Sequence, residues 1–435
     1  MTPARITPPR KPLSALSALR VGRRNILETV PQAVYHEPIV SGRTLWRWHS
    51  AASAEAMRHV LHDRADNYPK SKIMRRVLEP GIGGSIFVAD GNDWSWQRKA
   101  CAPAFRPRRI EEFAIRIANR TKAKLQAELL PRTGPIDVLP FLTDAAFEVV
   151  VDFVLGAQTA DEAEFKALVA EYLDRIGRIN AIDFLNLPVW MRQAFDLRNR
   201  PLVRRIQAAM DRIIDERSRQ SNNEGDLLDL LLEAVDPDGR PMSRKLVRSN
   251  LFAFLFAGHE TSALTLTWAL YLVAHAPDVQ DRIRAEGAEA ARGDSYAGQV
   301  IEETMRLYPP ASMLVRDARH DDQICGREIR RGDYVFLPIY ALHRHENAWA
   351  DPDRFDPDNF SPERRNNRER FQFLPFGAGP RICQGAAFAM MQTRVMLGTI
   401  LSMLRIAPSE NCNPHPELVI TLRPRGGIQL EMTPC

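Results

Sequence analysis

The chain has 435 residues, of which 45% are hydrophobic and 26% charged, so it can bury a large core and has an ordinary globular composition. Its formal net charge of +5 comes without a compact basic block, which gives little support to nucleic-acid binding. Five cysteines at long spacings, with no CxxC pair, argue against a disulfide framework and against a structural zinc site.

The first 25 residues are basic and contain no apolar run of signal-peptide or membrane-anchor length. In charge they resemble an organellar transit segment, but Pro3, Pro8, Pro9 and Pro12 would break the amphipathic helix that such a segment needs. We therefore expect a cytoplasmic protein. Residues 1–25 could be a flexible extension of a single domain that covers residues 1–435.

Hydrophobic periodicity predicts mostly helices along the chain. Residues 43–48 alternate like a short strand, and Ser50 or Ser53 could cap a helix that ends near His62. Helical periodicity then recurs in three stretches, residues 107–175, 202–219 and 224–235.

The longest apolar pattern extends from Ser249 to His275. His259 and Glu260 interrupt it at its middle, so we expect a buried core helix and not a membrane span. A helix that ends before Pro309, short strands within residues 323–339 and a helix after residue 385 follow. The pattern as a whole predicts a mainly α protein with a minor β component.

Residues 376–385, FGAGPRICQG, place Cys383 in a glycine-rich loop between two helical patterns. Glycines at 377, 379 and 385 allow backbone conformations that a Cβ would forbid, and would let a flat ligand approach closely. A helix that begins after Cys383 would favour its thiolate through the free N–H groups and the dipole of the helix N-terminus. Such a thiolate suits an axial metal ligand or a nucleophile, whereas an isolated cysteine is most often a buried structural residue.

The full spacing FxxGxRxCxG resembles the haem-ligand loop of the cytochrome P450 monooxygenases, here of the soluble bacterial type, in which a cysteine thiolate holds the haem iron. The resemblance implies the mainly α P450 fold, with haem b buried between the long central helix and the cysteine loop. It implies that Cys383 is the metal ligand. It also implies that Phe376, Gly377 and Arg381 contact the cofactor.

Four further segments follow in the order that the family has. In the first, AGHETS at residues 257–262, Ala253, Ala257 and Thr261 recur at helical spacing, and small side chains there would let the helix lie against a flat cofactor. Glu260 and Thr261 supply an acid and an alcohol for proton delivery. Taken alone, the segment could equally be a polar break in a core helix. The resemblance implies that Thr261 and Glu260 are catalytic and that Ala257 contacts haem.

The second segment contains Glu303 and Arg306, which share a helix face at i, i+3. By itself this spacing is weak, because Glu216 and Arg219 repeat it and are expected to be a surface pair. The resemblance implies that Glu303 and Arg306 form a buried three-residue ion network with Arg354 of PDRF, and that this network holds the cysteine loop.

The remaining two segments supply candidate partners for the haem propionates. Trp94 and Arg98 stand at i, i+4 and could both donate hydrogen bonds, although without the other motifs a half-buried surface helix is the simpler interpretation. By resemblance Arg316 also meets a propionate. With Arg381, these arginines would neutralise a buried dianionic edge.

The resemblance implies a haem-thiolate monooxygenase that inserts one atom of O2 into an apolar substrate. The residues expected to line the substrate pocket are Phe87, Ala253, Ala257 and Met313. Electrons from NAD(P)H would come through a separate ferredoxin or flavodoxin with its reductase, because about fifty residues after Cys383 leave no space for a fused redox domain. A monomer without membrane anchor or nucleic acid is expected. Arginines that flank the loop could steer an acidic partner or simply be solvated: Arg106, Arg108, Arg109, Arg364, Arg365, Arg368 and Arg370.

Two other functions remain open at this point. A peroxygenase would need no electron donor, but such enzymes replace the acid–alcohol pair that Glu260 and Thr261 keep. A haem sensor would need neither the pair nor a donor. The motifs do not choose between fatty acids, terpenoids and steroids as substrate.

Overall fold

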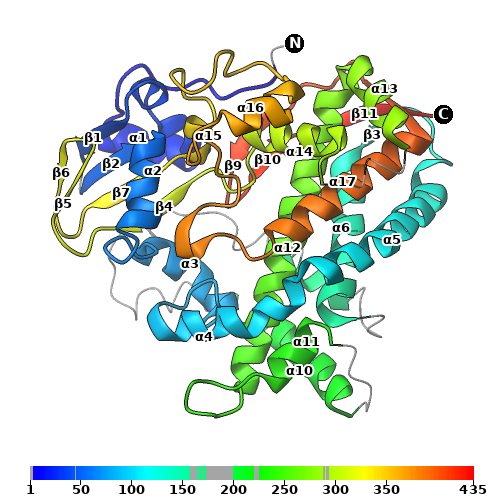
Figure 1. Ribbon diagram of the computed structural model, residues 1–435, viewed down its shortest axis with the longest axis horizontal. Helices are drawn as coiled ribbons and strands as arrows, with labels where there is room; N and C mark the ends of the chain where they lie inside the picture. The colour runs from blue at the N-terminus through cyan, green and yellow to red at the C-terminus, as the bar shows by residue number, and fades with distance from the viewer. Residues whose placement is uncertain are drawn as a thin grey trace. The chain divides into compact units, whose positions relative to one another are not determined.

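A computed structural model describes most of the chain (Figure 1), namely residues 3–44, 46–156, 164, 165, 167–169, 171, 172, 199–219, 225–287, 290 and 293–435. The chain divides into two compact units. Unit 1 comprises residues 1–71, 111–145 and 261–435, and unit 2 comprises residues 72–110 and 146–260. Three helices contain residues of both units: α5 (Pro107–Lys124), α6 (Val138–Leu155) and α12 (Arg244–Ala274).

Unit 1 contains many short helices. Its α-helices are α1 (Ala15–Gly22), α2 (Ala54–Arg58), α13 (Pro277–Glu286), α14 (Tyr296–Leu307), α15 (Ile339–Leu342), α16 (Pro362–Asn366) and α17 (Ala386–Met403). Two π-helical segments are η3 (His59–Asp63) and η5 (Leu125–Leu129). Short 3-10 helices are η1 (Ile26–Thr29), η2 (Gln32–Tyr35), η7 (Pro357–Phe360) and η8 (Gly379–Arg381).

Among the described residues, every strand lies in unit 1. The largest sheet has four strands in the order β1 (Ile39–Arg43), β2 (Arg47–Ala51), β7 (Tyr334–Leu337) and β4 (Leu314–Asp317). Its strands β2 and β7 are parallel and its other pairs antiparallel. Three smaller sheets are antiparallel. Two of them have two strands each, β5 (Asp322–Ile324) with β6 (Arg327–Ile329) and β9 (His415–Leu418) with β10 (Leu422–Arg425). In the third, β11 (Gln429–Pro434) lies between β3 (Ile136–Asp137) and β8 (Leu404–Pro408).

In the described part of unit 2 the regular elements are helices, joined by turns and by one isolated β-bridge between Val235 and Pro241. Besides its shares of α5, α6 and α12 it contains α3 (Lys72–Ile82), α4 (Gly91–Cys101), η4 (Ala102–Phe105), α10 (Arg200–Arg219) and α11 (Leu227–Glu233). None of the described helices is both long enough and apolar enough to cross a membrane.

Most of the expected elements are confirmed. The long apolar pattern forms α12, the helix before the double proline is α14, and the strands expected within 323–339 are β5, β6 and β7. Residues 43–48 differ from the expected single strand, because they contain the turn of the β1–β2 hairpin. The stretch 107–175 forms α5, η5 and α6 as far as Leu155, and most of residues 156–175 lies outside the described residues.

Local chemistry explains where several helices start and stop. Ser53 and Ser295 cap α2 and α14, each accepting the backbone N–H three residues further on, at 3.2 and 3.1 Å. Helix α14 ends at Leu307, two residues before the pair Pro309–Pro310, since proline can neither donate nor continue the helix.

The N-terminal segment is tied to unit 1 by tyrosine hydroxyls. Tyr308 donates to the carbonyl of Ala4 at 2.7 Å, and Tyr271 accepts the N–H of Ala4 at 3.2 Å. Two residues on, Tyr340 accepts the N–H of Ile6 at 3.2 Å, and the Ile6 side chain is buried. Residues 4–6 are therefore part of the fold of unit 1, although their composition alone suggested an extension.

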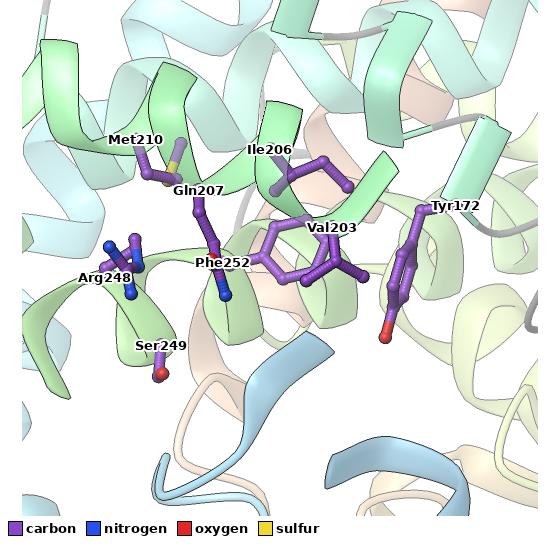
Figure 2. Close-up of a pocket in the computed structure, with 8 residues that line it drawn as sticks. All are labelled: Tyr172, Val203, Ile206, Gln207, Met210, Arg248, Ser249 and Phe252. Atoms are coloured by element: carbon purple, nitrogen blue, oxygen red, sulfur yellow. The ribbon is translucent and has the colours of Figure 1, made fainter. Parts of the chain in front are cut away.

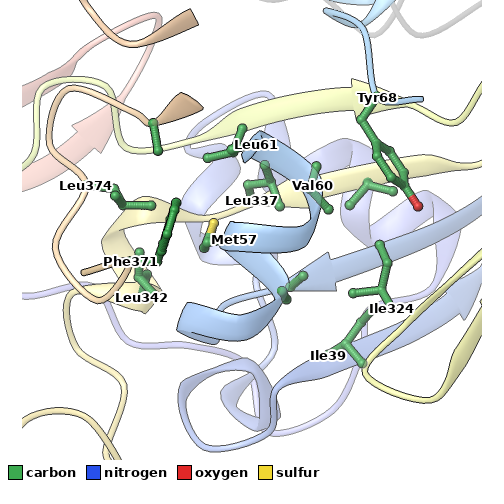
Figure 3. Close-up of a cluster of buried hydrophobic side chains, with 14 of the residues drawn as sticks. Ile39, Met57, Val60, Leu61, Tyr68, Ile324, Leu337, Leu342, Phe371 and Leu374 are labelled. Atoms are coloured by element: carbon green, nitrogen blue, oxygen red, sulfur yellow. The ribbon is translucent and has the colours of Figure 1, made fainter. Parts of the chain in front are cut away.

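A buried hydrophobic cluster holds the segment that precedes the cysteine loop in the chain (Figure 3). Leu61 of η3 packs in this cluster with Leu337 of β7 and with Phe371 and Leu374. Full burial of such side chains is worth about 1.5–3 kcal/mol each. The segment before residue 376 is thereby fixed to the four-stranded sheet and to η3.

Candidate active site

The loop of Cys383 is closed by its own backbone. The N–H of Cys383 donates to the carbonyl of Phe376 at 2.9 Å, and the N–H of Ile382 donates to the carbonyl of Gly379 at 3.1 Å. Upstream, the N–H of Gly377 donates to the carbonyl of Leu374 at 3.1 Å. Cys383 itself is exposed, three residues before α17 begins. The loop thus presents one accessible thiol beside a helix N-terminus.

Two of the three loop glycines are needed for backbone reasons. Gly377 has a φ of 71° and Gly379 a φ of 68°, a region that side chains disfavour. At Gly379 a Cβ would also overlap the carbonyl of Leu61 in η3, so this glycine allows the loop to lie directly on the π-helical segment. Gly385 has an ordinary φ of −84°. The expectation of special backbone geometry therefore applies to Gly377 and Gly379 and is wrong for Gly385.

Cys101 shows the contrasting case. It is completely buried in unit 2, and burial raises the pKa of its thiol to about 12, so it stays protonated and unreactive. Cys383 is exposed, as is Cys435, but only Cys383 lies in a glycine-shaped loop at the start of a helix. It is the better candidate for a metal ligand.

The predicted pair Glu303 and Arg306 is fully buried on α14. Arg306 donates to both carboxylate oxygens of Glu303, at 2.7 and 2.8 Å, in a bidentate arrangement. Arg306 also donates to the backbone carbonyls of His343, Pro352 and Arg354, at 3.0, 2.6 and 2.7 Å. The pair therefore fixes the backbone of residues 343–354 to α14.

The third member of the predicted network is wrong. Arg354 contributes its backbone carbonyl, but its side chain is exposed and forms no ion pair with Glu303. Asn359 of η7 lies there instead, with its amide nitrogen 3.4 Å from each Glu303 carboxylate oxygen. Each residue follows its own copy of the sequence DPD, Arg354 after residues 351–353 and Asn359 after residues 356–358. The path of the chain, which the sequence does not reveal, decides which side chain meets Glu303.

A second cation reaches this region from further along the chain. The Arg368 guanidinium lies over the rings of Phe360 and Trp349, at 4.2 and 4.8 Å from their centroids. Burial lowers the pKa of Arg368 to about 10, while the carboxylates of Glu302 and Glu303 oppose that change. It therefore stays charged at neutral pH. The sequence offered no signal for this residue beyond its place in an arginine-rich stretch.

Helix α12 is buried on nearly all sides. From Ser249 to Ala274 every side chain is buried except an accessible stripe, defined as Phe254, Ala257, Gly258 and Thr261. These four recur at i, i+3, i+4 and i+7, which places them on one face of the helix. The stripe contains two of the predicted residues, Ala257 and Thr261.

The other predicted residues of α12 lie off this stripe. Ala253 is completely buried, because it lies about 100° round the helix from Phe254. Glu260 is 6% exposed. Ala253 therefore does not face an open side of the helix as the i, i+4, i+8 spacing suggested.

The neighbouring residues of AGHETS have structural roles. The ring of His259 meets Phe147 of α6 edge-on at 5.4 Å, and its Nδ1 lies 2.7 Å from the carbonyl of Leu255. A Cβ on Gly258 would lie 3.1 Å from Val150, so this glycine lets α6 approach closely. Within unit 1, Ser262 donates to Gln392 of α17 at 3.2 Å.

Unit 2 holds three of the remaining predicted residues. The guanidinium of Arg98 lies over the ring of Trp94 at 5.6 Å, which confirms that the two share a face of α4. Phe87 is half-buried and meets Phe254, the first residue of the accessible stripe, edge-on at 6.3 Å. Phe254 in turn contacts Phe105 at 5.6 Å. These rings form an aromatic group next to the stripe.

Unit 1 holds the others. Arg316 is half-buried on β4, and Met313 is half-buried just before that strand. Arg381 is half-buried in η8, two residues before the cysteine. Phe376 and Gly377 line a cavity of about 260 Å³ on the side of the loop that faces Met305 of α14.

The sequence model of the cytochrome P450 family matches residues 36–432. The chain is a cytochrome P450. Among curated proteins it is 28% identical to cytochrome P450 4F5 of Rattus norvegicus over 404 residues, which cover 84% of this chain and 76% of the rat protein. It is 29% identical to a cytokinin hydroxylase of Arabidopsis thaliana, with 84% and 74% of the two chains covered.

Solved P450 structures show the same fold. Cyanobacterial CYP120A1 with bound retinoic acid superposes with a TM-score of 0.82 at 21% identity, over 100% of both chains. The haem domain of cytochrome P450DA gives a TM-score of 0.80 at 22% identity, over 99% of both chains. The mainly α fold with minor β is thereby confirmed.

Membership of the P450 family establishes the class of reaction and of cofactor. The protein is a haem-thiolate monooxygenase that carries haem b, uses O2 and receives electrons derived from NAD(P)H through a redox partner. The residues of each unit fit such a cofactor when the units are taken separately. Unit 1 offers an exposed thiol and the half-buried Arg316 and Arg381, and unit 2 offers Trp94 and Arg98 on one helix face.

A second recess in this P450 is too small for an organic substrate. It has a volume of about 10 Å³, about one water molecule, and lies within unit 2 between α10 and α12 (Figure 2). Its lining residues are Tyr172, Val203, Ile206, Gln207, Met210, Arg248, Ser249 and Phe252. The accessible stripe of α12 is the better place to look for substrate contacts.

Proposed function

We propose that Cys383 is the only protein ligand of the haem iron in this P450. The observation that carries the proposal is its exposed thiol, in a loop closed by the 2.9 Å hydrogen bond from its own N–H to Phe376. Bound there, haem supplies the activation of O2. Trp94, Arg98 and two further arginines, Arg316 and Arg381, would bind the propionates as charge-assisted donors.

The accessible stripe of α12 supports a role for Thr261 in proton delivery. Its hydroxyl lies on the one open face of the helix, where it can hold a water molecule at Oγ1. Glu260 is the adjacent acid, and its almost complete burial would keep bulk water from replacing it as the proton source. Ala257, one turn earlier, leaves space for a flat cofactor at this face.

The substrate is proposed to be apolar and to contact the aromatic group of unit 2. Phe87 and Phe254 meet edge-on at 6.3 Å and present ring surface at the stripe. Met313, on unit 1, is proposed as a further contact. Ala253 is left out of this proposal, since its side chain is completely buried.

A separate ferredoxin or flavodoxin is proposed as the electron donor, to a monomeric enzyme in the cytoplasm. The arginines expected to steer it are partly engaged within unit 1, because Arg365 pairs with Glu302, Arg364 pairs with Asp356 and Arg368 is half-buried. These contacts favour a structural role for that stretch. The proposal of a ferredoxin or flavodoxin therefore rests on the need of P450 enzymes for an electron donor and not on these arginines.

Product formation from lipophilic candidates tests this proposal. The purified protein is incubated with each compound and NADPH, with and without ferredoxin and its reductase, and separately with hydrogen peroxide. Product only in the presence of both proteins supports the proposal. Efficient turnover with peroxide alone would make the protein a peroxygenase, and haem binding without any turnover would make it a sensor.

A further inference from the structure

We infer that His343 is a positioning residue that ties the cysteine loop to the buried pair on α14. His343 follows α15 directly, and its side chain is completely buried. Its Nε2 accepts the N–H of Leu374 at 2.8 Å, while its own backbone carbonyl accepts from Arg306 at 3.0 Å. One residue therefore bonds both to the ion pair and to the segment that leads into the loop.

The contacts of the ring fix its protonation. Because the Leu374 N–H can only donate, Nε2 must carry a lone pair. The ring proton is then on Nδ1, which faces the carbonyl of Met305 at 3.3 Å. The ring also packs against Phe373, with 5.0 Å between centroids. Only a neutral imidazole in this one tautomer satisfies both backbone partners.

The same contacts lead on to Cys383. The carbonyl of Leu374 accepts the N–H of Gly377, which follows Phe376, and Phe376 accepts the N–H of Cys383. A shift of Leu374 would therefore move the turn at Gly377 and the carbonyl that anchors the cysteine. The ring of His343 bonds to backbone atoms of Met305 and Leu374, so we assign its effect on Cys383 to this backbone and not to the reacting atoms. This inference rests on the proposed role of Cys383 as ligand.

Two amide substitutions separate the hydrogen bond from general packing. In His343→Gln the amide lies where Nε2 was and can accept the Leu374 N–H, whereas in His343→Asn it lies where Nδ1 was and cannot reach that N–H. His345→Phe is the control, because His345 is also buried on the same segment but its Nε2 lies near the carbonyl of Glu37 instead.

The measurements are amide hydrogen exchange at Leu374 and the ferrous–CO spectrum of the full-length haem protein. We expect His343→Asn to exchange the Leu374 amide about 10- to 100-fold faster, as for loss of one buried hydrogen bond, and to lose the red-shifted CO band more readily on warming. His343→Gln and His345→Phe should stay close to the original protein in both measurements.

Equal behaviour of the Gln and Asn variants, including equal failure to fold, would overturn the inference. The exchange measurement does not depend on the identity of the iron ligand. If Cys383 were not the ligand, its own substitution would leave the CO band unchanged while the Leu374 result still stood. The two proposals can therefore fail independently.

Discussion

In unit 1 the loop of Cys383 is held by directed polar contacts, whereas in unit 2 the group around Phe87 is held by ring contacts. The loop backbone is bonded at Gly377, Ile382 and Cys383, and the segments before it are bonded to Arg306 and His343. The rings of unit 2 meet at 5.4 to 6.3 Å without a hydrogen bond between them.

The difference has a physical consequence for function. Hydrogen bonds weaken steeply when their geometry changes, so the loop can occupy essentially one position. Hydrophobic contacts are not directional, and a ring can be replaced or moved at modest cost. We expect the loop to carry the chemistry that all members share and the aromatic group to carry the choice of substrate.

Among changes to the polar contacts around the loop, Arg306→Ala should have the largest effect on stability. It would leave Glu303 buried without its guanidinium, where burial already raises the pKa of the carboxyl. We expect a loss of about 3–5 kcal/mol in the free energy of unfolding, measured by urea denaturation. Arg354→Ala, at the exposed arginine, should stay within about 0.5 kcal/mol. A large effect of Arg354→Ala would restore the three-residue ion network of Glu303, Arg306 and Arg354 expected from the sequence.

Acid should loosen the loop region through His343. Burial, with smaller contributions from the nearby Arg306 and Arg344, lowers the pKa of this imidazole to about 3. The unfolded chain takes up the proton at about 6.5, so this stabilisation is complete above pH 6.5 and is lost as the pH falls towards 3. Denaturation curves at pH 7 and pH 5 should show a smaller loss in His343→Gln than in the original protein. An identical loss would mean that other groups control it.

Thr261→Ala tests the open face of α12. NADPH consumption and substrate binding should continue, while product per NADPH falls and hydrogen peroxide rises, by the equivalent of about 3–5 kcal/mol if proton delivery contributes its usual ~10²–10⁴-fold. Thr267→Ala is the control, because that hydroxyl is buried against the carbonyl of Ala263 on the same helix. Full coupling in Thr261→Ala would mean that another group delivers the proton.

Phe87→Ala should have only a modest effect on stability. Losing the edge-on contact with Phe254 should cost about 1 kcal/mol, since the ring is only half-buried. The position of oxidation in the product should change, as measured by mass spectrometry of the products. A change in stability with unchanged products would make Phe87 an ordinary core residue.

Structural features could be predicted best from the sequence where a short stretch of the chain determines them. The glycines at 377 and 379 could be recognised because their backbone geometry depends on neighbours in the chain. The i, i+3 spacing of Glu303 and Arg306 is weak by itself, and the family resemblance singled out this pair. The structural roles of Asn359, Arg368 and His343 were missed, because their contacts depend on how the chain folds back on itself and not on a local pattern.

The errors have the same origin. The family resemblance assigned this place to Arg354, but its side chain is exposed in the turn at residues 351–354, before η7, and Asn359 of η7 contacts Glu303 instead. Ala253 was placed by an i, i+4 rule, but the tertiary packing that surrounds α12 decides which face stays open. Gly379 was correctly singled out, yet a backbone carbonyl of η3 supplies a reason that the loop sequence does not contain.

The ferrous–CO spectrum of Cys383→His tests the central claim most directly. Thiolate ligation gives a red-shifted CO band, and a histidine ligand does not. The account predicts that the variant binds haem, keeps its fold by circular dichroism and lacks this band, while substitution of the exposed Cys435 leaves the band intact. A red-shifted band that persists in Cys383→His would contradict the assignment of Cys383 as the ligand.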